Sequence, residues 1–447
     1  MSLEKFFHLK ENNTTVKTEI MAGVTSFMTM AYILAVNPNI LAAAGMDHGA
    51  VFTATAVASF IGTLCMALFA NYPFALAPGM GLNAYFAYTV VLGMGYSWEV
   101  ALAAVLAEGI IFIILSCFNI REAIFNAIPF NLKKAVSVGI GLFITFLGLQ
   151  NAKIVIGGAT LVGLFSVDGY NKTLADGLTA SMSDAGITVL LAIFGVLITG
   201  ILITWILGII CQFAGIYVPN PDLGFYNLLP DFSNGISIPS LAPIMFKFSL
   251  KGVPVLEFIV IVFAFLFVDL FDTLGTLIGV SAKADMLDSE GRLPRIKGAL
   301  LADAVGTTCG ACLGTSTVTT FVESASGVTE GGRTGLTSLT TGILFLLSLF
   351  LSPIFLAIPS FATAPALIVV GFYMIGSVSE IDFNDPAEGI PAFLCIIAMP
   401  FFYSISEGIS MGVIAYVVMN LFAGKKEKIT PVMYILAVLF ILKYILM

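Results

Sequence analysis

Five carboxylate side chains lie inside long apolar runs of the chain or at breaks in these runs: Glu108, Asp269, Asp272, Glu323 and Glu407. An ionised acid at the middle of a lipid bilayer costs about 2.5–3.5 kcal/mol. The five together, if unpaired, would cost about 12–17 kcal/mol, which exceeds the margin by which a protein is usually stable. We therefore expect each acid to be neutralised by a partner, a proton or a bound cation.

Basic side chains are too distant in the sequence to be these partners. No Lys or Arg stands between Lys17 and Arg121, and none occupies the middle of the run that holds Asp269. None stands between Arg333 and Lys425 either. Protonation, hydrogen bonding or a transported cation remain as the ways to neutralise the acids. This pattern is typical of a proton-coupled carrier, and it leaves sodium open as the cation.

Three of the acids are candidates for substrate binding and for proton coupling. Asp269 and Asp272 stand three positions apart and share one face of a helix, and Glu323 begins a second segment. In the functional interpretation, one carboxylate binds N–H groups of a substrate and a neighbour carries a proton. In the alternative, acids hydrogen-bond backbone groups that broken helices leave unpaired, and we expect this role for Glu108 and Glu407.

The elements that position these acids include two runs that cannot be ordinary helices. Run 72–86 contains residues that forbid a continuous helix before Asn83, namely Pro73, Pro78, Gly79 and Gly81. Run 314–327 is rich in Thr and favours an extended backbone up to about Phe321. Each run predicts an extended piece followed by a half-helix.

The two interrupted runs each fall third in one half of the chain. Paired interruptions at matching places in two repeats indicate the binding site of a transporter, because half-helix N-termini there offer unpaired N–H groups. In the alternative, glycine and proline only permit tight packing of helices.

The composition predicts an all-α polytopic membrane protein. Of 447 residues, 59% are hydrophobic and 10% are charged, whereas a soluble domain has about 25% charged residues. Apolar runs of about 16–22 residues fit helices that span a lipid bilayer, not barrel strands. The net charge of −8 and the lack of a basic patch exclude nucleic acid as a partner. Cys309 and Cys312 are far in sequence from His8 and His48, so we expect no metal and no cofactor.

The apolar runs recur in two halves of similar hydropathy, which indicates an internal duplication. The positive-inside rule places all five basic clusters, and with them the N-terminus, on the cytoplasmic side of the cell membrane. Run 186–215 must then cross twice or not at all, and we expect two short or re-entrant helices. The last run, 431–446, either spans the membrane or lies in its interface.

Four long motifs give the chain a family resemblance. The chain resembles the AzgA-like purine permeases, the guanine, hypoxanthine and adenine carriers of the nucleobase/cation symporter superfamily, to which uracil permease also belongs. The motifs occur in the family's order over nearly the whole chain: 31–41 (AYILAVNPNIL), 77–86 (APGMGLNAYF), 269–275 (DLFDTLG) and 314–327 (GTSTVTTFVESASG).

The resemblance implies about fourteen helices in two inverted repeats of seven. It implies a cytoplasmic segment 1–19, a core (transport) domain of 20–118 plus 255–352, and a gate domain of 119–254 plus 353–447. A homodimer that forms through the gate domain is left open. It also implies a purine between the half-helices, bound by Asn83, Asp269 and Glu323, with Phe321 in the place of an aromatic residue and Asp272 as a further functional acid. Run 187–216 looks shorter than the sixth and seventh helices of the family, so the helix count is in doubt there.

Purine chemistry agrees with these residues. A carboxylate can accept N1–H and the 2-amino group of guanine as a pair, and an Asn amide suits a ring edge that mixes donor and acceptor. A neutral base brings no charge, so uphill import requires a co-transported ion, for which we expect a proton in preference to sodium. Two rival functions are a channel and an intramembrane aspartyl protease. The protease is disfavoured because Asp269 and Asp272 lie on one helix, not on two facing ones.

Overall fold

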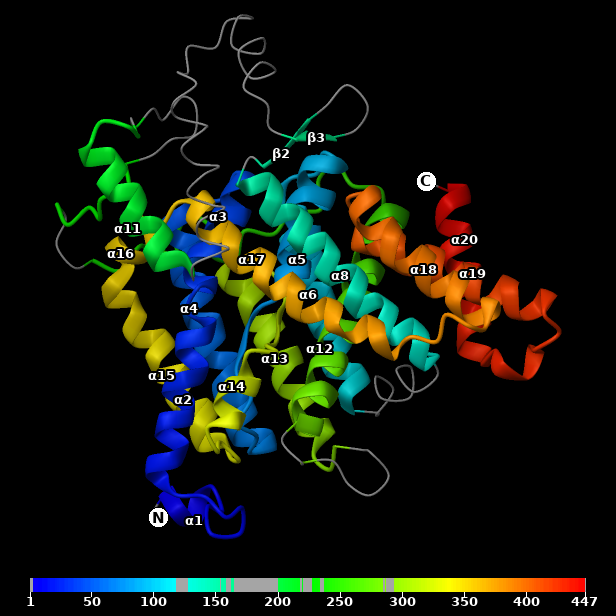
Figure 1. Ribbon diagram of the computed structural model, residues 1–447, viewed down its shortest axis with the longest axis horizontal. Coiled ribbons are helices and arrows are strands. Elements are labelled where there is room, and N and C mark those ends of the chain that lie inside the picture. Colours follow the sequence, from blue (N-terminus) through cyan, green and yellow to red (C-terminus); the bar gives the residue numbers. More distant parts are fainter. Residues whose placement is uncertain are drawn as a thin grey trace, which may run out of the picture.

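The chain folds into an almost entirely helical protein (Figure 1). The computed structural model describes residues 3–446 except 118–127, 153, 158–161, 165–199, 218, 220–226, 234–236, 284–285 and 287–292. Two short strand pairs are present in the described part, β1 with β4 and β2 with β3. The second pair, β2 (Val155–Gly157) and β3 (Val162–Leu164), is a peripheral hairpin.

Seven helical stretches within the described residues are long and apolar enough to cross a membrane: Val16–Ala43, His48–Ala70, Trp98–Ser116, Phe130–Gln150, Ile296–Leu313, Gly335–Leu356 and Phe361–Glu380. Shorter apolar helices cover Ile201–Phe213, Pro386–Phe401, Glu407–Phe422 and Pro431–Leu442. The expectation of an all-α multi-pass membrane protein is therefore confirmed. The number of fourteen helices stays a prediction, because residues 186–199 of run 186–215 lie outside the described residues.

One bundle, here called the first bundle, is built from both halves of the sequence. Its helices pack as α2 with α14 and α15, α4 with α3, α13 and α15, and α6 with α12 and α13. Its elements are α2 (Val16–Met30), α3 (Ile33–Ala43), α4 (His48–Cys65), η1 (Met66–Ala70), β1 (Leu76–Pro78), α5 (Met80–Ala84), η2 (Tyr85–Gly93), α6 (Trp98–Cys117), α12 (Val255–Lys283), α13 (Ile296–Leu313), β4 (Val318–Thr320), α14 (Ser324–Thr329) and α15 (Gly335–Leu347).

A second bundle forms around α8, which lies side by side with α17 across the front of Figure 1. Here α18 packs on α8 and α19, and α20 packs on α19. Its elements are α8 (Phe130–Asn151), α17 (Ser360–Ile375), η5 (Gly376–Glu380), α18 (Pro386–Phe401), α19 (Ile405–Phe422), η6 (Lys426–Lys428) and α20 (Pro431–Leu446). The remaining elements are α1 (Leu3–Phe6), α11 (Gly200–Phe213), η4 (Ser348–Leu351) and α16 (Ser352–Leu356).

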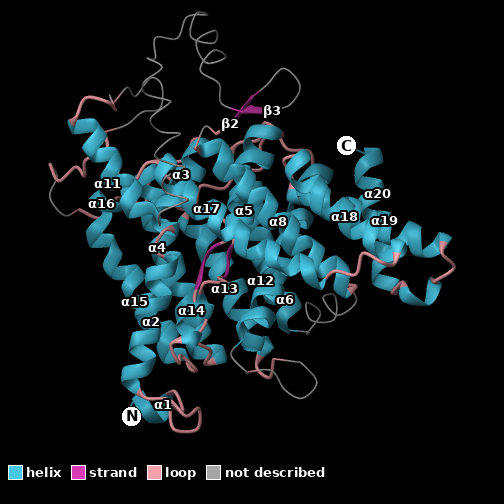
Figure 2. Ribbon diagram, viewed as in Figure 1, coloured by secondary structure: helices cyan, strands magenta, loops and turns pink. Residues whose placement is uncertain are grey.

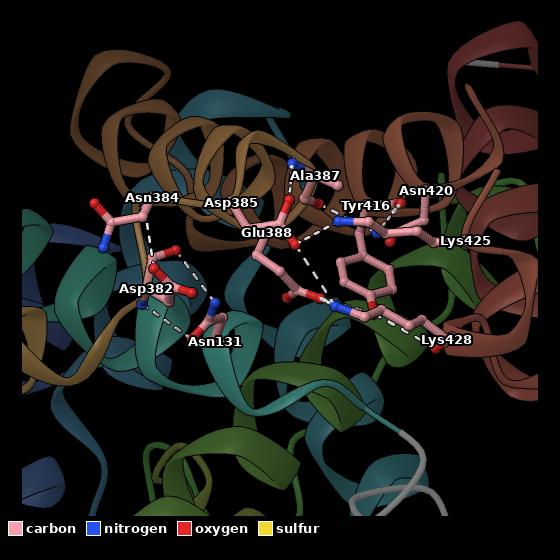
Figure 3. A network of polar contacts seen from close by, with 10 residues as sticks. All are labelled: Asn131, Asp382, Asn384, Asp385, Ala387, Glu388, Tyr416, Asn420, Lys425 and Lys428. Atoms are coloured by element: carbon pink, nitrogen blue, oxygen red, sulfur yellow. Dashed lines mark hydrogen bonds and ion pairs between the residues drawn. The ribbon is translucent and has the colours of Figure 1, made fainter. Parts of the chain in front are cut away.

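Polar contacts close one end of the second bundle (Figure 3). The N-cap of α18 is Asp385, whose carboxylate accepts from Ala387 N and from Lys425 Nζ at 2.6 Å. Lys428 Nζ lies 3.3 Å from an oxygen of Glu388, and the hydroxyl of Tyr416 donates to the same carboxylate at 3.4 Å. These contacts join the start of α18 to the segment between α19 and α20.

The β1–β4 pair lies in the middle of the first bundle, where Figure 2 draws it in magenta among helices. The antiparallel pairing joins Leu76 to Thr320 and Pro78 to Val318. Extended backbone inside a membrane protein needs internal partners, because lipid supplies none. Two threonines supply them in the same way: Thr63 of α4 bonds both N–H and C=O of Leu76, and Thr307 of α13 bonds both of Val318. The helix–strand–helix unit thus occurs once in each half of the chain.

The structure corrects details of the predicted breaks. The predicted interruption of run 72–86 is confirmed, because β1 and Gly79 are extended and a half-helix follows. That half-helix begins at Met80, earlier than Asn83, and includes Gly81; a glycine within a helix costs only about 1 kcal/mol relative to alanine. Apolar run 20–43 divides into α2 and α3 at residues 31–32. The polar stretch 165–184 lies outside the described residues.

Candidate functional site

The two broken segments are held against each other by backbone hydrogen bonds at both ends of the strand pair. Gly79 N donates to Thr317 O at 2.9 Å, and Phe321 N donates to Ala75 O at 3.0 Å. α12 packs against β4, α5 and α14. This packing brings the acids of α12 to the place where both breaks meet.

A buried cluster of oxygen atoms surrounds the hydroxyl of Thr273 on α12. Thr273 Oγ1 lies 2.8 Å from Asp269 Oδ1, 2.8 Å from Asp303 Oδ1 and 2.6 Å from Thr319 Oγ1. All four side chains are fully or almost fully buried. The cluster therefore links α12 to α13 and to β4, and Asp269 is one of its members.

Asp272 lies against the start of the first half-helix. A Cβ atom on Gly79 would lie 3.3 Å from Asp272 Oδ2 and 2.5 Å from Thr319 Cγ2, so no side chain fits at that position without a shift. Asp303 and Glu323 both act electrostatically on Asp272. The acids that the sequence singles out at positions 269, 272 and 323 are thus neighbours in space.

Glu323 occupies the N-cap position of α14, as expected for a residue that begins the second half-helix. The hydroxyl of Tyr32, from the break between α2 and α3, donates to Glu323 Oε1 at 2.6 Å. Beside it, the hydroxyls of Thr29 and Ser326 lie 2.9 Å apart, and Ser326 Oγ donates to Glu323 O at 2.6 Å. The broken first helix therefore orients the carboxylate of Glu323 directly.

Asn83 is buried on α5, and its hydrogen bonds go to the extended segments, not to an acid. Its Oδ1 accepts from the hydroxyl of Ser316, and its Nδ2 lies 3.5 Å from Pro78 O. Phe321 is also buried, directly after β4. The substrate-binding roles predicted for Asn83 and Phe321 stay predictions.

Glu108 and Glu407, for which the sequence predicts hydrogen bonds to backbone groups, each accept from a side-chain hydroxyl, and the backbone role stays a prediction. Glu108 Oε2 accepts from Thr317 Oγ1 at 2.6 Å, which fixes the start of the second extended segment. Glu407 accepts from the hydroxyl of Tyr444 on α20. Each acid joins two elements through a hydroxyl.

Sequence reasoning missed three residues of this site: Tyr32, Thr273 and Asp303. Asp303 carried a similar signal, a carboxylate in the middle of apolar run 297–313, although Lys297 stands at the start of that run. Tyr32 lies in the motif at 31–41, but nothing local marks it as a partner of Glu323. Within the described residues, no group of three or more His, Cys, Asp or Glu side chains is arranged to hold a metal ion.

The described architecture occurs in a solved transporter. The transmembrane domain of the cyanobacterial bicarbonate transporter BicA superposes with a TM-score of 0.62 over 89% of this chain and 97% of that one, at 17% sequence identity. At this identity the similarity concerns the fold alone. The fold is that of a multi-pass membrane transporter.

Sequence comparison identifies the family. The chain belongs to the permease family of xanthine/uracil permeases, whose model matches residues 17–433. The guanine/hypoxanthine permease PbuO of Bacillus subtilis is 44% identical over 98% of this chain and 99% of its own length. The adenine permease AdeP of Escherichia coli is 40% identical over 99% of this chain and 96% of its own. Members of this family are transporters, so the protein is not an enzyme.

Proposed function

We propose that the protein is a secondary active transporter that imports purine nucleobases, namely guanine, hypoxanthine or adenine, by proton symport. The observation that carries the proposal is the meeting of Asp269, Asp272 and Glu323 at the two helix breaks. End-to-end similarity to purine permeases of two bacteria, named above, supports the choice of substrate.

The hydrogen-bonding capacity of the acids suits a purine. Glu323 uses one oxygen for Tyr32, and its other oxygen can accept an N–H group of a base. Asp272 packs closely against Gly79, whose lack of a Cβ atom allows this approach to the start of the half-helix. Asn83 adds an amide that can meet a mixed ring edge, and Phe321 adds an aromatic face for stacking. The proposed substrate site therefore consists of Asn83, Asp269, Phe321 and Glu323.

We further assign the two bundles to the two domains of a carrier. In this assignment the first bundle, within 20–118 plus 255–352, is the transport domain that holds the site. The second bundle, within 119–254 plus 353–447, is the gate domain. The two meet beside the site, where a Cβ atom on Gly81 of α5 would lie 2.9 Å from Ile405 Cδ1 and 3.4 Å from Ile140 Cγ2.

Contacts near the N-terminus support a cytoplasmic location for it. Asn71 Nδ2 donates to Phe7 O, and Asn71 Oδ1 accepts from Gly335 N. Arg295 stacks over the ring of Tyr72, 4.6 Å from its centre. These contacts bring the N-terminal segment to the end of the first bundle that also holds Arg295 and the start of α15 after Arg333. Three basic clusters therefore share one end, which the positive-inside rule assigns to the cytoplasm.

Uptake of radiolabelled purines into cells that lack their own purine carriers tests the proposal. We expect uphill accumulation that rises when the medium is acidified, collapses with a protonophore and is unchanged when sodium is replaced by choline. Glu323→Gln in the same cells is the inactive control. Sodium-dependent uptake that resists the protonophore would replace the proton by sodium, and uptake that only equilibrates would indicate a channel. No purine uptake at all would contradict the proposal.

A further inference from the structure

Thr273 makes more close oxygen contacts than one hydroxyl hydrogen can explain. Its Oγ1 lies 2.8 Å from Asp269 Oδ1 and 2.8 Å from Asp303 Oδ1, both within hydrogen-bond distance for O–H···O pairs. A hydroxyl carries one hydrogen and can donate it to only one of the two carboxylates. The other carboxylate then faces an oxygen lone pair of Thr273.

A second hydrogen must therefore lie between Thr273 and one of the aspartates. Thr319, the third contact at 2.6 Å, can donate to Thr273 or accept from it, but it cannot place a hydrogen on the line between Thr273 and an aspartate. If both aspartates were ionised, one short contact would join two oxygens without a hydrogen. If one aspartate is a carboxylic acid, its O–H donates to Thr273, and Thr273 donates to the other.

The groups around the pair also disfavour two negative charges. Asp272 on α12 lies beside Gly79, and Glu108 on α6 accepts a hydrogen bond from Thr317. Glu323, directly before α14, lies close enough to Asp272 for the two charges to interact. Farther toward the second bundle, the carboxyls of Glu407 and Glu108 both interact electrostatically with the hydroxyl of Tyr85. The carboxyl groups among them, when ionised, oppose the ionisation of a neighbouring carboxyl because like charges repel.

We propose that Asp269 and Asp303 hold one exchangeable proton between them through the hydroxyl of Thr273, and that Asp303 is a positioning residue for the coupled proton. The inference deepens the proposed function and rests on it. On release, the O–H bond of the acid breaks, the proton passes to water as hydronium, and the bonding electrons stay on the carboxylate. Release leaves two carboxylates beside one hydroxyl. Because Asp269 is on α12 and Asp303 is on α13, their repulsion favours a different position of α12 against α13, and proton binding is thereby linked to this position.

Infrared spectroscopy of the purified protein tests the shared proton without transport. At neutral pH we expect a carboxylic acid C=O band that shifts in heavy water, disappears in Asp303→Asn and is disturbed in Thr273→Val. Thr273→Ser, which keeps the hydroxyl, should retain the band, and Asp385→Asn at the far end of the second bundle is the matched control. A band that Asp303→Asn and Thr273→Val leave unchanged, or no such band in the wild type, would overturn the inference.

Transport in proteoliposomes separates this inference from the proposed function. Under an inward gradient of one pH unit, one-proton symport accumulates the purine about tenfold. Asp303→Asn should lower this ratio to about one, because without the shared proton the gradient no longer drives uptake, and exchange of internal for external purine should fall less than accumulation does. Undiminished accumulation by Asp303→Asn contradicts the inference alone. Failure of the wild type to accumulate the purine contradicts proton symport. In that case the infrared band alone tests whether Asp269 and Asp303 share a proton.

Discussion

The hydroxyl of Tyr32 donates a 2.6 Å hydrogen bond to Oε1 of Glu323, although 291 positions separate the two residues. Tyr32 lies where the first long helix breaks into α2 and α3, and Glu323 lies where the second extended segment turns into α14. Two irregular points, one in each half of the chain, thus meet at one carboxylate. The contact occupies one oxygen of Glu323, and in the proposed function the second oxygen accepts an N–H group of the substrate.

Tyr32→Phe should weaken purine binding while the protein still folds. A hydrogen bond to a charged group contributes about 1.5–3 kcal/mol, so we expect the KM for uptake to rise roughly tenfold or more. Uptake kinetics and equilibrium binding of a labelled purine measure the effect. Tyr373→Phe, at an exposed tyrosine of α17, is the control. Equal kinetics in both variants would remove Tyr32 from the site.

Glu323→Gln and Glu108→Gln should behave differently. The amide at position 323 loses the anionic acceptor for a purine N–H, and we expect uptake to fall by at least about tenfold with normal membrane insertion. At position 108 the amide oxygen can still accept from Thr317, so substantial binding should remain. Loss of binding in a well-folded Glu108→Gln protein would mean that the substrate lies near Thr317 and not near Glu323. Asp269→Asn should resemble Glu323→Gln.

Asn83→Ala should change the order in which guanine, hypoxanthine and adenine compete for uptake. These bases differ in the donors and acceptors on the ring edge, and a site that pairs such groups penalises a ligand that leaves them unpaired. Competition assays measure the order. Because Asn83 also accepts from Ser316, an equal loss of affinity for all three bases would make it a support for the extended segment.

Gly81→Val should slow transport more than it weakens binding. The added side chain would overlap Ile405 and Ile140 where the two bundles meet, and overpacking costs about 1–3 kcal/mol. Purine uptake rates and equilibrium binding separate the two effects. Because the nearest atom is the end of a flexible side chain, Ile405→Ala should restore part of the rate in the double variant. No rescue would show that Gly81 and Ile405 act independently.

Asp385→Asn should lower the melting temperature of the detergent-solubilised protein at neutral pH. The hydrogen bond from Lys425, and then that from Ala387 N, holds the pKa of Asp385 below its ordinary range. A carboxyl with a lowered native pKa stabilises the fold above its unfolded pKa, near about 3.9, and this contribution disappears as the pH falls through the native pKa. The difference between variant and wild type should therefore shrink below about pH 4. Asp385→Ala, which also loses the N-cap, should melt lower still.

The local chemistry of the sequence was enough to predict the two helix breaks and most of the acids beside them. Pro78 cannot donate to a helix, and the threonines after Gly314 favour extended backbone, so both interruptions were predictable without a partner strand. The acids at 269, 272 and 323 were conspicuous because a charge in an apolar run has a known cost. The start of the helix at Met80 was not predictable, because packing decides whether a glycine such as Gly81 is tolerated in a helix.

The sequence by itself thus determined a polytopic helical protein with two matching broken segments and acids beside them, because residue type and spacing control local backbone and transfer energy. Only the tertiary structure decided which groups meet. Periodicity and composition do not encode the long-range contacts of Tyr32 with Glu323, of Asp303 with Thr273 and of Glu108 with Thr317. Such contacts arise because β1 and β4 pair across the first bundle and bring three helices to the same point.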